Sequence, residues 1–177
     1  TMTATKQDLT NAKKLVNEMA HNEGYDSRVK NFLKDVRVLS LPKTIIATRL
    51  LIDEMTKEKG FTRHDGRDYF VHPIAVAQTA LDFGIISRLM HEGRVELADE
   101  ILATCLLHDT IEDIDFITKE KLVRLFGNEI ADKVDNVSKR KGEPFEDYIK
   151  RVSSNQVSAL VKILDRLNNV STLSHST

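Results

Sequence analysis

Apolar residues recur along this chain at intervals of three and four, which is the spacing of amphipathic helices and not of strands. The pattern predicts helices over residues 6–22, 27–39, 44–58, 74–83, 128–138, 145–152 and 156–173, one that begins near residue 97 and carries His108, and one between Thr118 and Gly127. No segment shows the alternation of a β-hairpin. We therefore expect an all-α bundle of about eight to nine helices.

Two polar segments interrupt the helical pattern. Residues 61–73 combine glycine with a high density of charge, which indicates a loop. Pro73 suits the first turn of the helix that follows, so His72 is expected at the entrance of that helix. Residues 139–144 form a basic turn, for which a solvated surface is the simpler interpretation.

Composition and charge restrict the environment of the chain. Its 177 residues suffice for one core, and we expect a helical extension over residues 1–41 packed on a single unit over residues 42–177. The net charge of -1 gives no reason to expect nucleic-acid binding, and no apolar run approaches the ~20 residues of a membrane span. Cys105 is the single cysteine, which favours a reducing compartment and hence a cytoplasmic location. Its apolar surroundings favour a core residue over a catalytic thiol.

The segment 102–113 places one imidazole and three carboxylates at the end of an apolar helix. Residues four apart share a helical face, so His108 is expected to align with Glu112, and Asp109 with Asp113. Unpaired charges in such a position are costly to bury. A divalent cation would resolve this crowding.

Two residues elsewhere complete a candidate metal site. A helix N-terminus disfavours an imidazolium, so a neutral, metal-binding His72 suits its position. Asp165 interrupts an apolar strip of the last helix, where an acid is either paired with a basic residue or is a ligand. With His108 and Asp109 they offer two imidazoles and two carboxylates, a set that suits one Mn²⁺, Fe²⁺, Co²⁺ or Zn²⁺ ion better than Ca²⁺ or Mg²⁺.

The order His72, His108-Asp109, Asp165 resembles the H…HD…D signature of the HD phosphohydrolase superfamily, which implies an all-α HD-domain bundle. Further motifs narrow the resemblance to the hydrolase domain of RelA/SpoT-type enzymes, and in scale to small alarmone hydrolases and metazoan SpoT homologues. These motifs, spread in order from about residue 44 to residue 173, are Arg63-x-x-Gly66-x-x-Tyr69-x-x-His72-Pro73, Leu106-Leu107-His108-Asp109-Thr110-Ile111-Glu112-Asp113, Phe126-Gly127 and Lys162-x-x-Asp165-Arg166-Leu167-x-Asn169.

The resemblance implies a Mn²⁺-dependent hydrolase that removes the 3′-pyrophosphate from (p)ppGpp, giving GDP or GTP and pyrophosphate. It implies that the two imidazoles and two carboxylates hold the metal, and that Glu112 and Asp113 orient and deprotonate the attacking water. For the guanosine substrate it implies that Arg63 stacks on the base, Asn169 meets the ribose and Thr172 lies by the base. Lys162, Arg166 or the loop 139–141 would screen the leaving pyrophosphate. Tyr69 belongs to the motif, although a packing role explains it equally well.

The chain departs from the family pattern at three positions. His64 occupies a usually basic position, while Asn168 and Ser171 replace residues that are commonly His or aromatic and Arg. We expect these last two changes to affect substrate choice more than catalysis. The length leaves no room for a synthetase domain, so alarmone synthesis is not expected.

Two other functions remain open on the sequence. An HD domain with the same metal site can act as a nucleotidase, a dNTP triphosphohydrolase or an NADPH phosphatase. A non-catalytic module that senses a nucleotide is the other alternative, although such a module has no need of Glu112 and Asp113. The expected partner is a guanosine nucleotide, with no nucleic acid and no membrane, and the oligomeric state is undetermined.

Overall fold

A computed structural model describes residues 5–56, 59–62, 66 and 68–176, and from residue 171 onward it describes the backbone alone. Within these residues the regular elements are helices, beside one isolated bridge between Thr62 and Asp68. The helices are α1 (Lys6–Ala20), α2 (Ser27–Leu39), α3 (Pro42–Glu54), α4 (Val71–Asp82), α5 (Ile85–His91), α6 (Val95–Leu107), α7 (Thr110–Asp113), α8 (Lys119–Phe126), α9 (Asn128–Val137), α10 (Phe145–Ser153) and α11 (Gln156–Ser176).

The prediction of an all-α bundle is confirmed. The described residues hold more helices than the expected eight to nine, because α5 and α7 are short separate elements. None of the described helices combines the length and the apolarity needed to span a bilayer.

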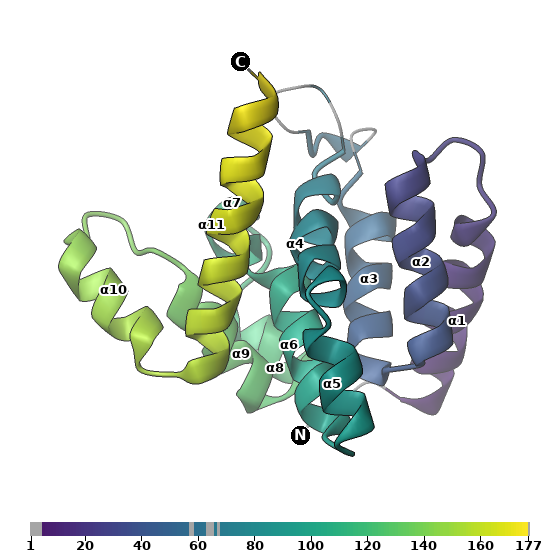
Figure 1. Ribbon diagram of the computed structural model, residues 1–177, viewed down its shortest axis with the longest axis horizontal. Helices are drawn as coiled ribbons and strands as arrows, with labels where there is room; N and C mark the ends of the chain where they lie inside the picture. The colour runs from purple at the N-terminus through teal and green to yellow at the C-terminus, as the bar shows by residue number, and fades with distance from the viewer. Residues whose placement is uncertain (1–4, 57–58, 63–65, 67, 177) are drawn as a thin grey trace.

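Helix α6 lies at the centre of the bundle (Figure 1) and packs against α3, α4, α5, α9 and α11. Its residues from Ile101 to Leu107 are all buried, which explains why this helix reads as a continuous apolar run instead of an amphipathic one. The C-terminal end of α6 therefore delivers the following residues, His108 and Asp109, to a position enclosed by other helices.

Helices α1 and α2 lie along one side of the bundle, where both contact α3 and α2 also contacts α4. Their buried side chains, among them Val16 and Phe32, belong to the same hydrophobic core as those of α6. The expected division of the chain near residue 41 stays a prediction.

Helix α3 receives its N-terminal cap from α6. Its N-cap residue, Leu41, has no side chain able to accept a hydrogen bond, and Pro42 occupies the first turn. The buried carboxylate of Asp99 instead accepts the backbone N–H groups of Lys43 at 3.0 Å and Thr44 at 2.7 Å, and the Thr44 hydroxyl at 2.7 Å. This contact joins the start of α3 to α6.

Replacing Asp99 with alanine is expected to lower the free energy of unfolding by about 2 kcal/mol, because buried donors at the start of α3 lose their acceptor. For a domain of this size the thermal midpoint then falls by roughly 4–8 °C, which circular dichroism will measure on metal-free protein. Asp115→Ala, at an exposed aspartate, is the control and should leave the midpoint near that of the wild type. Equal melting of all three proteins would contradict the capping role.

Candidate metal centre

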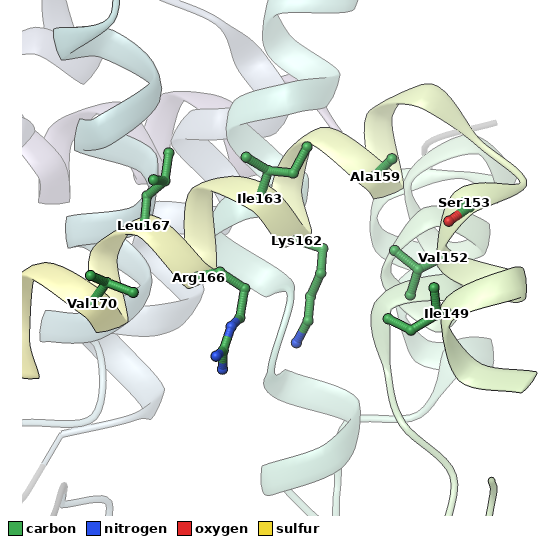
Figure 2. Close-up of a pocket in the computed structure, with 9 residues that line it drawn as sticks. All are labelled: Ile149, Val152, Ser153, Ala159, Lys162, Ile163, Arg166, Leu167 and Val170. Carbon is green, nitrogen blue, oxygen red and sulfur yellow. The ribbon is translucent and has the colours of Figure 1, made fainter. Parts of the chain in front are cut away.

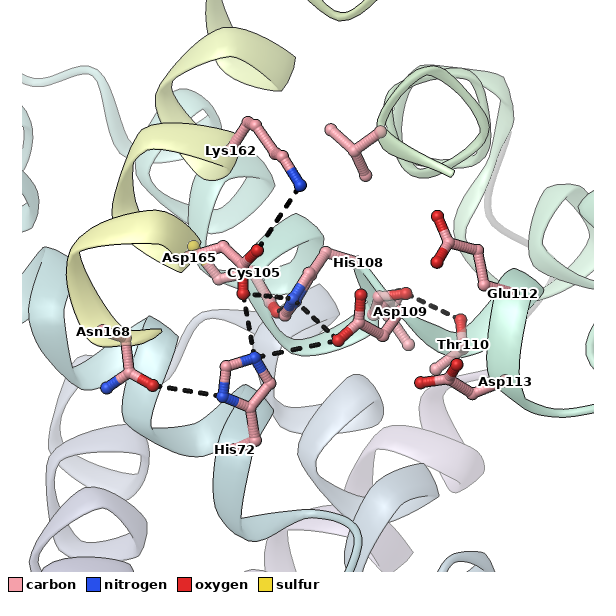
Figure 3. A network of polar contacts seen from close by, with 12 residues as sticks. His72, Cys105, His108, Asp109, Thr110, Glu112, Asp113, Lys162, Asp165 and Asn168 are labelled. Carbon is pink, nitrogen blue, oxygen red and sulfur yellow. Dashed lines mark hydrogen bonds and ion pairs between the residues drawn. The ribbon is translucent and has the colours of Figure 1, made fainter. Parts of the chain in front are cut away.

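Four side chains from three parts of the fold converge beside α6 (Figure 3). His72 comes from the first turn of α4, His108 and Asp109 from the turn between α6 and α7, and Asp165 from α11. One ligand atom of each lies within 4.8 Å of the others, a spacing that can hold a metal ion. Three of the four are buried and Asp109 is partly exposed, so the cluster opens to solvent on the Asp109 side.

The two imidazoles direct the same ring nitrogen at the two carboxylates. Asp165 Oδ1 lies 2.9 Å from His72 Nε2 and 3.2 Å from His108 Nε2. Asp109 Oδ2 lies 3.1 Å from His108 Nε2 and 3.7 Å from His72 Nε2. The set therefore presents two Nε2 atoms and two carboxylates around one point.

The opposite nitrogen of each ring meets an acceptor. His108 Nδ1–H donates to the carbonyl oxygen of Cys105 at 2.6 Å, and His72 Nδ1–H donates to Asn168 Oδ1 at 3.1 Å. Because neither oxygen carries a proton, each Nδ1 must carry one, which leaves Nε2 of the neutral ring with its lone pair. This is the tautomer that binds a metal, so the donor set fits a divalent transition-metal ion.

The electrostatics of the cluster also favour a cation. Burial disfavours the charged form of His108, but Asp109 and Asp165 outweigh it and raise the pKa of His108 to about 10. Burial raises the pKa of Asp165, whereas the hydrogen bonds from His108 and His72 hold that pKa far below its ordinary value. Without a metal, the carboxylates thus retain a proton on His108, and a bound cation would replace that proton.

The expected continuous helix through His108 and Glu112 is not observed. Helix α6 ends at Leu107, and α7 begins at Thr110. The Thr110 hydroxyl donates to the carbonyl oxygen of Leu107 at 2.7 Å, at the point where the helix breaks. Because of this break, His108 stays buried while Glu112 reaches the surface of the molecule.

Glu112 and Asp113 lie beside the cluster without joining it. Glu112 Oε1 accepts the backbone N–H of Lys139, from the loop between α9 and α10. Burial raises the pKa of Glu112, the Lys139 N–H opposes this, and the charges of Asp109 and Asp113 add to the rise. The structure therefore provides a carboxylate of raised pKa next to the cluster.

Tyr69 connects the polar segment before α4 to the acids of α7. Its hydroxyl donates to Asp113 Oδ2 at 3.2 Å, and its ring is buried. The Tyr69 ring therefore packs in the core, while its hydroxyl contacts Asp113, one of the two acids expected to act on the water.

Lys162 lies between the cluster and a surface groove. Its Nζ is 3.7 Å from Asp165 Oδ2 and 5.3 Å from the centre of the Tyr148 ring. The groove, of about 360 Å³, runs between α10 and α11 and is mostly apolar, with Lys162 and Arg166 as its basic members (Figure 2). None of the four clustered side chains lines the groove, but Lys162 both lines it and contacts Asp165 of the cluster.

The sequence is similar to named proteins from several bacteria. The chain is 35% identical over 154 residues to the guanosine-3′,5′-bis(diphosphate) 3′-pyrophosphohydrolase of Vibrio cholerae, covering 80% of this chain and 20% of that protein. It is 35% identical over 131 residues to a GTP pyrophosphokinase of Myxococcus xanthus, covering 66% and 16%. It is 31% identical over 157 residues to the GTP pyrophosphokinase rsh of Brucella melitensis, covering 82% and 18%.

Over most of its length the chain is similar to these proteins of (p)ppGpp metabolism, which is consistent with a RelA/SpoT-type HD domain. It spans a fifth or less of the length of these curated relatives. No family model matches the sequence, and no solved structure matches it either.

The residues expected to bind substrate in this RelA/SpoT-type domain are only partly described. Asn169 is half-buried on α11, four residues after Asp165 and therefore on the same side of that helix. Arg63 and the side chain of Thr172 lie outside the described residues, as do His64 and the side chain of Ser171.

The partners of the two clustered histidines were not predicted from the sequence. Asn168, expected to affect substrate choice, hydrogen-bonds to His72, and Cys105 contributes its carbonyl oxygen. Burial raises the pKa of the Cys105 thiol well above its ordinary value, which fits a core residue. Nothing in the sequence spacing indicates the contact between Asn168 and His72. The contact of His108 could have been predicted, because the carbonyl three residues before a histidine at a helix end is within reach of its ring.

Proposed function

We propose that this domain hydrolyses the 3′-pyrophosphate bond of (p)ppGpp in a metal-dependent reaction, giving GDP or GTP and pyrophosphate. The observation that carries the proposal is a pair of Nε2 atoms and two carboxylates at one point, with a separate carboxylate of raised pKa beside them. The name of the Vibrio cholerae relative supports this substrate. Other relatives are named GTP pyrophosphokinases, so hydrolysis rather than synthesis is itself part of the proposal.

In the proposed enzyme one Mn²⁺ ion is held by His72, His108, Asp109 and Asp165. The mixed nitrogen and oxygen donors support Mn²⁺, and they also suit Fe²⁺, Co²⁺ or Zn²⁺. When bound, such an ion lowers the pKa of water and neutralises charge on a phosphoryl oxygen.

Glu112 is proposed as the general base. It lies outside the cluster, so it is available to accept a proton from the attacking water. Its hydrogen bond from the Lys139 N–H holds the carboxylate in one orientation. Asp113, whose carboxylate is held by the Tyr69 hydroxyl, is proposed to orient the same water.

The substrate is proposed to be a guanosine nucleotide recognised by Arg63, Asn169 and Thr172. Lys162 is proposed to screen the charge of the leaving pyrophosphate, because its ammonium group already lies beside the cluster. The resemblance to RelA/SpoT-type hydrolase domains supports the assignment, and for Asn169 so does its place on α11, four residues after Asp165.

The test is a substrate screen on metal-free protein to which Mn²⁺ is returned. We expect pyrophosphate release from ppGpp with Mn²⁺ and its loss on addition of EDTA, measured by chromatography of the nucleotide products. Cleavage of dATP or NADPH with ppGpp untouched would instead identify one of the other HD-type activities. Nucleotide binding without any turnover would support the sensing module and refute the hydrolase.

A further inference from the structure

We infer that Asn168 is a positioning residue of the metal centre, which holds the ring of His72 so that its Nε2 faces the cluster. The inference rests on the metal centre of the proposed function and assigns to this chain a residue that acts through a ligand. It replaces our expectation that position 168 affects substrate choice.

The two histidines of the cluster are oriented by different kinds of partner. His108 Nδ1–H donates to the main-chain carbonyl of Cys105, three residues earlier on the same chain segment. The partner of His72 Nδ1 is a side chain, the amide oxygen of Asn168, which lies 96 positions later in the sequence. The orientation of the His108 ring is therefore local, whereas that of His72 depends on the residue type at position 168.

The position of Asn168 on α11 makes this contact possible. It follows Asp165 by three residues, so both side chains leave the same side of the helix and reach His72 from the same direction. Asp165 Oδ1 meets Nε2 at 2.9 Å, and Asn168 Oδ1 meets Nδ1 at 3.1 Å (Figure 3). One helix thus supplies a candidate ligand and the group that holds a second candidate ligand.

The chemistry of the amide explains what Asn168 does for His72. An oxygen acceptor at Nδ1 keeps the proton on that nitrogen and the lone pair on Nε2. The ring is buried and packs edge-on against the His108 ring with centroids 5.4 Å apart, so a flipped or rotated ring would direct the wrong atom at the cluster. Outer partners of this kind typically change metal affinity by about 10–100-fold when they are removed.

The experiment compares Mn²⁺ binding to metal-free wild type, Asn168→Leu and Asn168→Asp by isothermal titration calorimetry. Leucine has the same branched shape and no acceptor, whereas aspartate keeps an oxygen at the same place. We expect the leucine variant to bind Mn²⁺ about 10–100-fold more weakly and the aspartate variant to bind at least as tightly as the wild type. Asn11→Leu, the same change at an exposed residue of α1, is the matched control and should bind as the wild type does.

Activity at saturating metal separates a positioning role from substrate recognition. If Asn168 acts through His72, excess Mn²⁺ restores much of the activity of Asn168→Leu, and its KM for ppGpp stays near that of the wild type. A raised KM with unchanged Mn²⁺ affinity would overturn the inference in favour of substrate recognition. Thermal unfolding checks that the variants are folded, and Asn168→Ala, which adds no bulk, replaces the leucine variant if that protein does not fold.

The outcomes also distinguish this inference from the proposals on which it rests. Wild-type protein that binds no Mn²⁺ would overturn the metal centre and the inference with it. Equal binding by wild type and Asn168→Leu would overturn the inference alone. Normal Mn²⁺ results with no cleavage of ppGpp would refute the proposed reaction and leave the role of Asn168 supported.

Discussion

Asp165→Asn is expected to weaken Mn²⁺ binding by more than about 100-fold, beyond the usual effect of an outer partner. One oxygen of Asp165 approaches the Nε2 atoms of both His72 and His108, so the change removes a charged donor from the middle of the cluster. Loss of the ion removes several kcal/mol of transition-state stabilisation, which corresponds to a fall in turnover of roughly 10³-fold or more. Calorimetry on metal-free protein and a ppGpp assay measure the two effects.

Asparagine has nearly the same volume as aspartate, so the helix packing around position 165 should survive the change. Asp147→Asn makes the same substitution at an exposed residue of α10 and should leave both metal affinity and turnover unchanged. If Asp165→Asn bound Mn²⁺ as tightly as the wild type, the cluster would not be the metal site.

Glu112→Gln is expected to lower turnover by roughly 10²–10⁴-fold, the usual contribution of a positioned general base, while Mn²⁺ affinity stays near that of the wild type. Glutamine can still accept the Lys139 N–H through its amide oxygen, but it cannot take a proton from water. The substitution therefore separates base catalysis from anchoring of the loop between α9 and α10.

Comparison of Glu112→Gln with Glu112→Ala completes the test. A base predicts similar, severe losses in both variants, whereas an anchor predicts that glutamine retains activity and alanine does not. Glu120→Ala, at an exposed glutamate of α8, is the control and should turn over ppGpp normally. Full activity of Glu112→Gln would remove Glu112 from the mechanism as a base.

The raised pKa of Glu112 also gives the reaction a pH dependence. Only the ionised carboxylate can accept a proton, and burial with neighbouring acids moves the pKa of Glu112 above the ordinary value of 4.5. Turnover should therefore fall as the pH drops through this raised pKa, so that the acidic limb of the profile lies above that value. The residual activity of Glu112→Gln should lack the same limb.

The helices could be predicted from the sequence because the spacing of apolar residues that indicates them is local. Residues 27–39 were expected as a helix from apolar spacing and flanking Ser40 and Pro42, and α2 has these bounds. The break between α6 and α7 was not accessible, because His108 and Asp109 lie inside an otherwise helical pattern. At the break, the Thr110 hydroxyl bonds to the Leu107 carbonyl and the preceding turn is buried. The spacing of apolar residues in the sequence indicates neither of these two features.

The candidate metal ligands could also be predicted from the sequence, because an imidazole or carboxylate beside an apolar run must be paired with another charge or with a metal. The sequence therefore determined the helical class, the resemblance to RelA/SpoT-type domains and the four side chains that converge. The roles of these four side chains stay predictions. Only the tertiary structure decided which groups distant in sequence contact one another in and around the site. Asn168 reaches His72, Tyr69 reaches Asp113 and Asp99 caps α3 because helices distant in sequence pack together. Such contacts depend on how the helices are placed in space, and a one-dimensional pattern carries no measure of that placement.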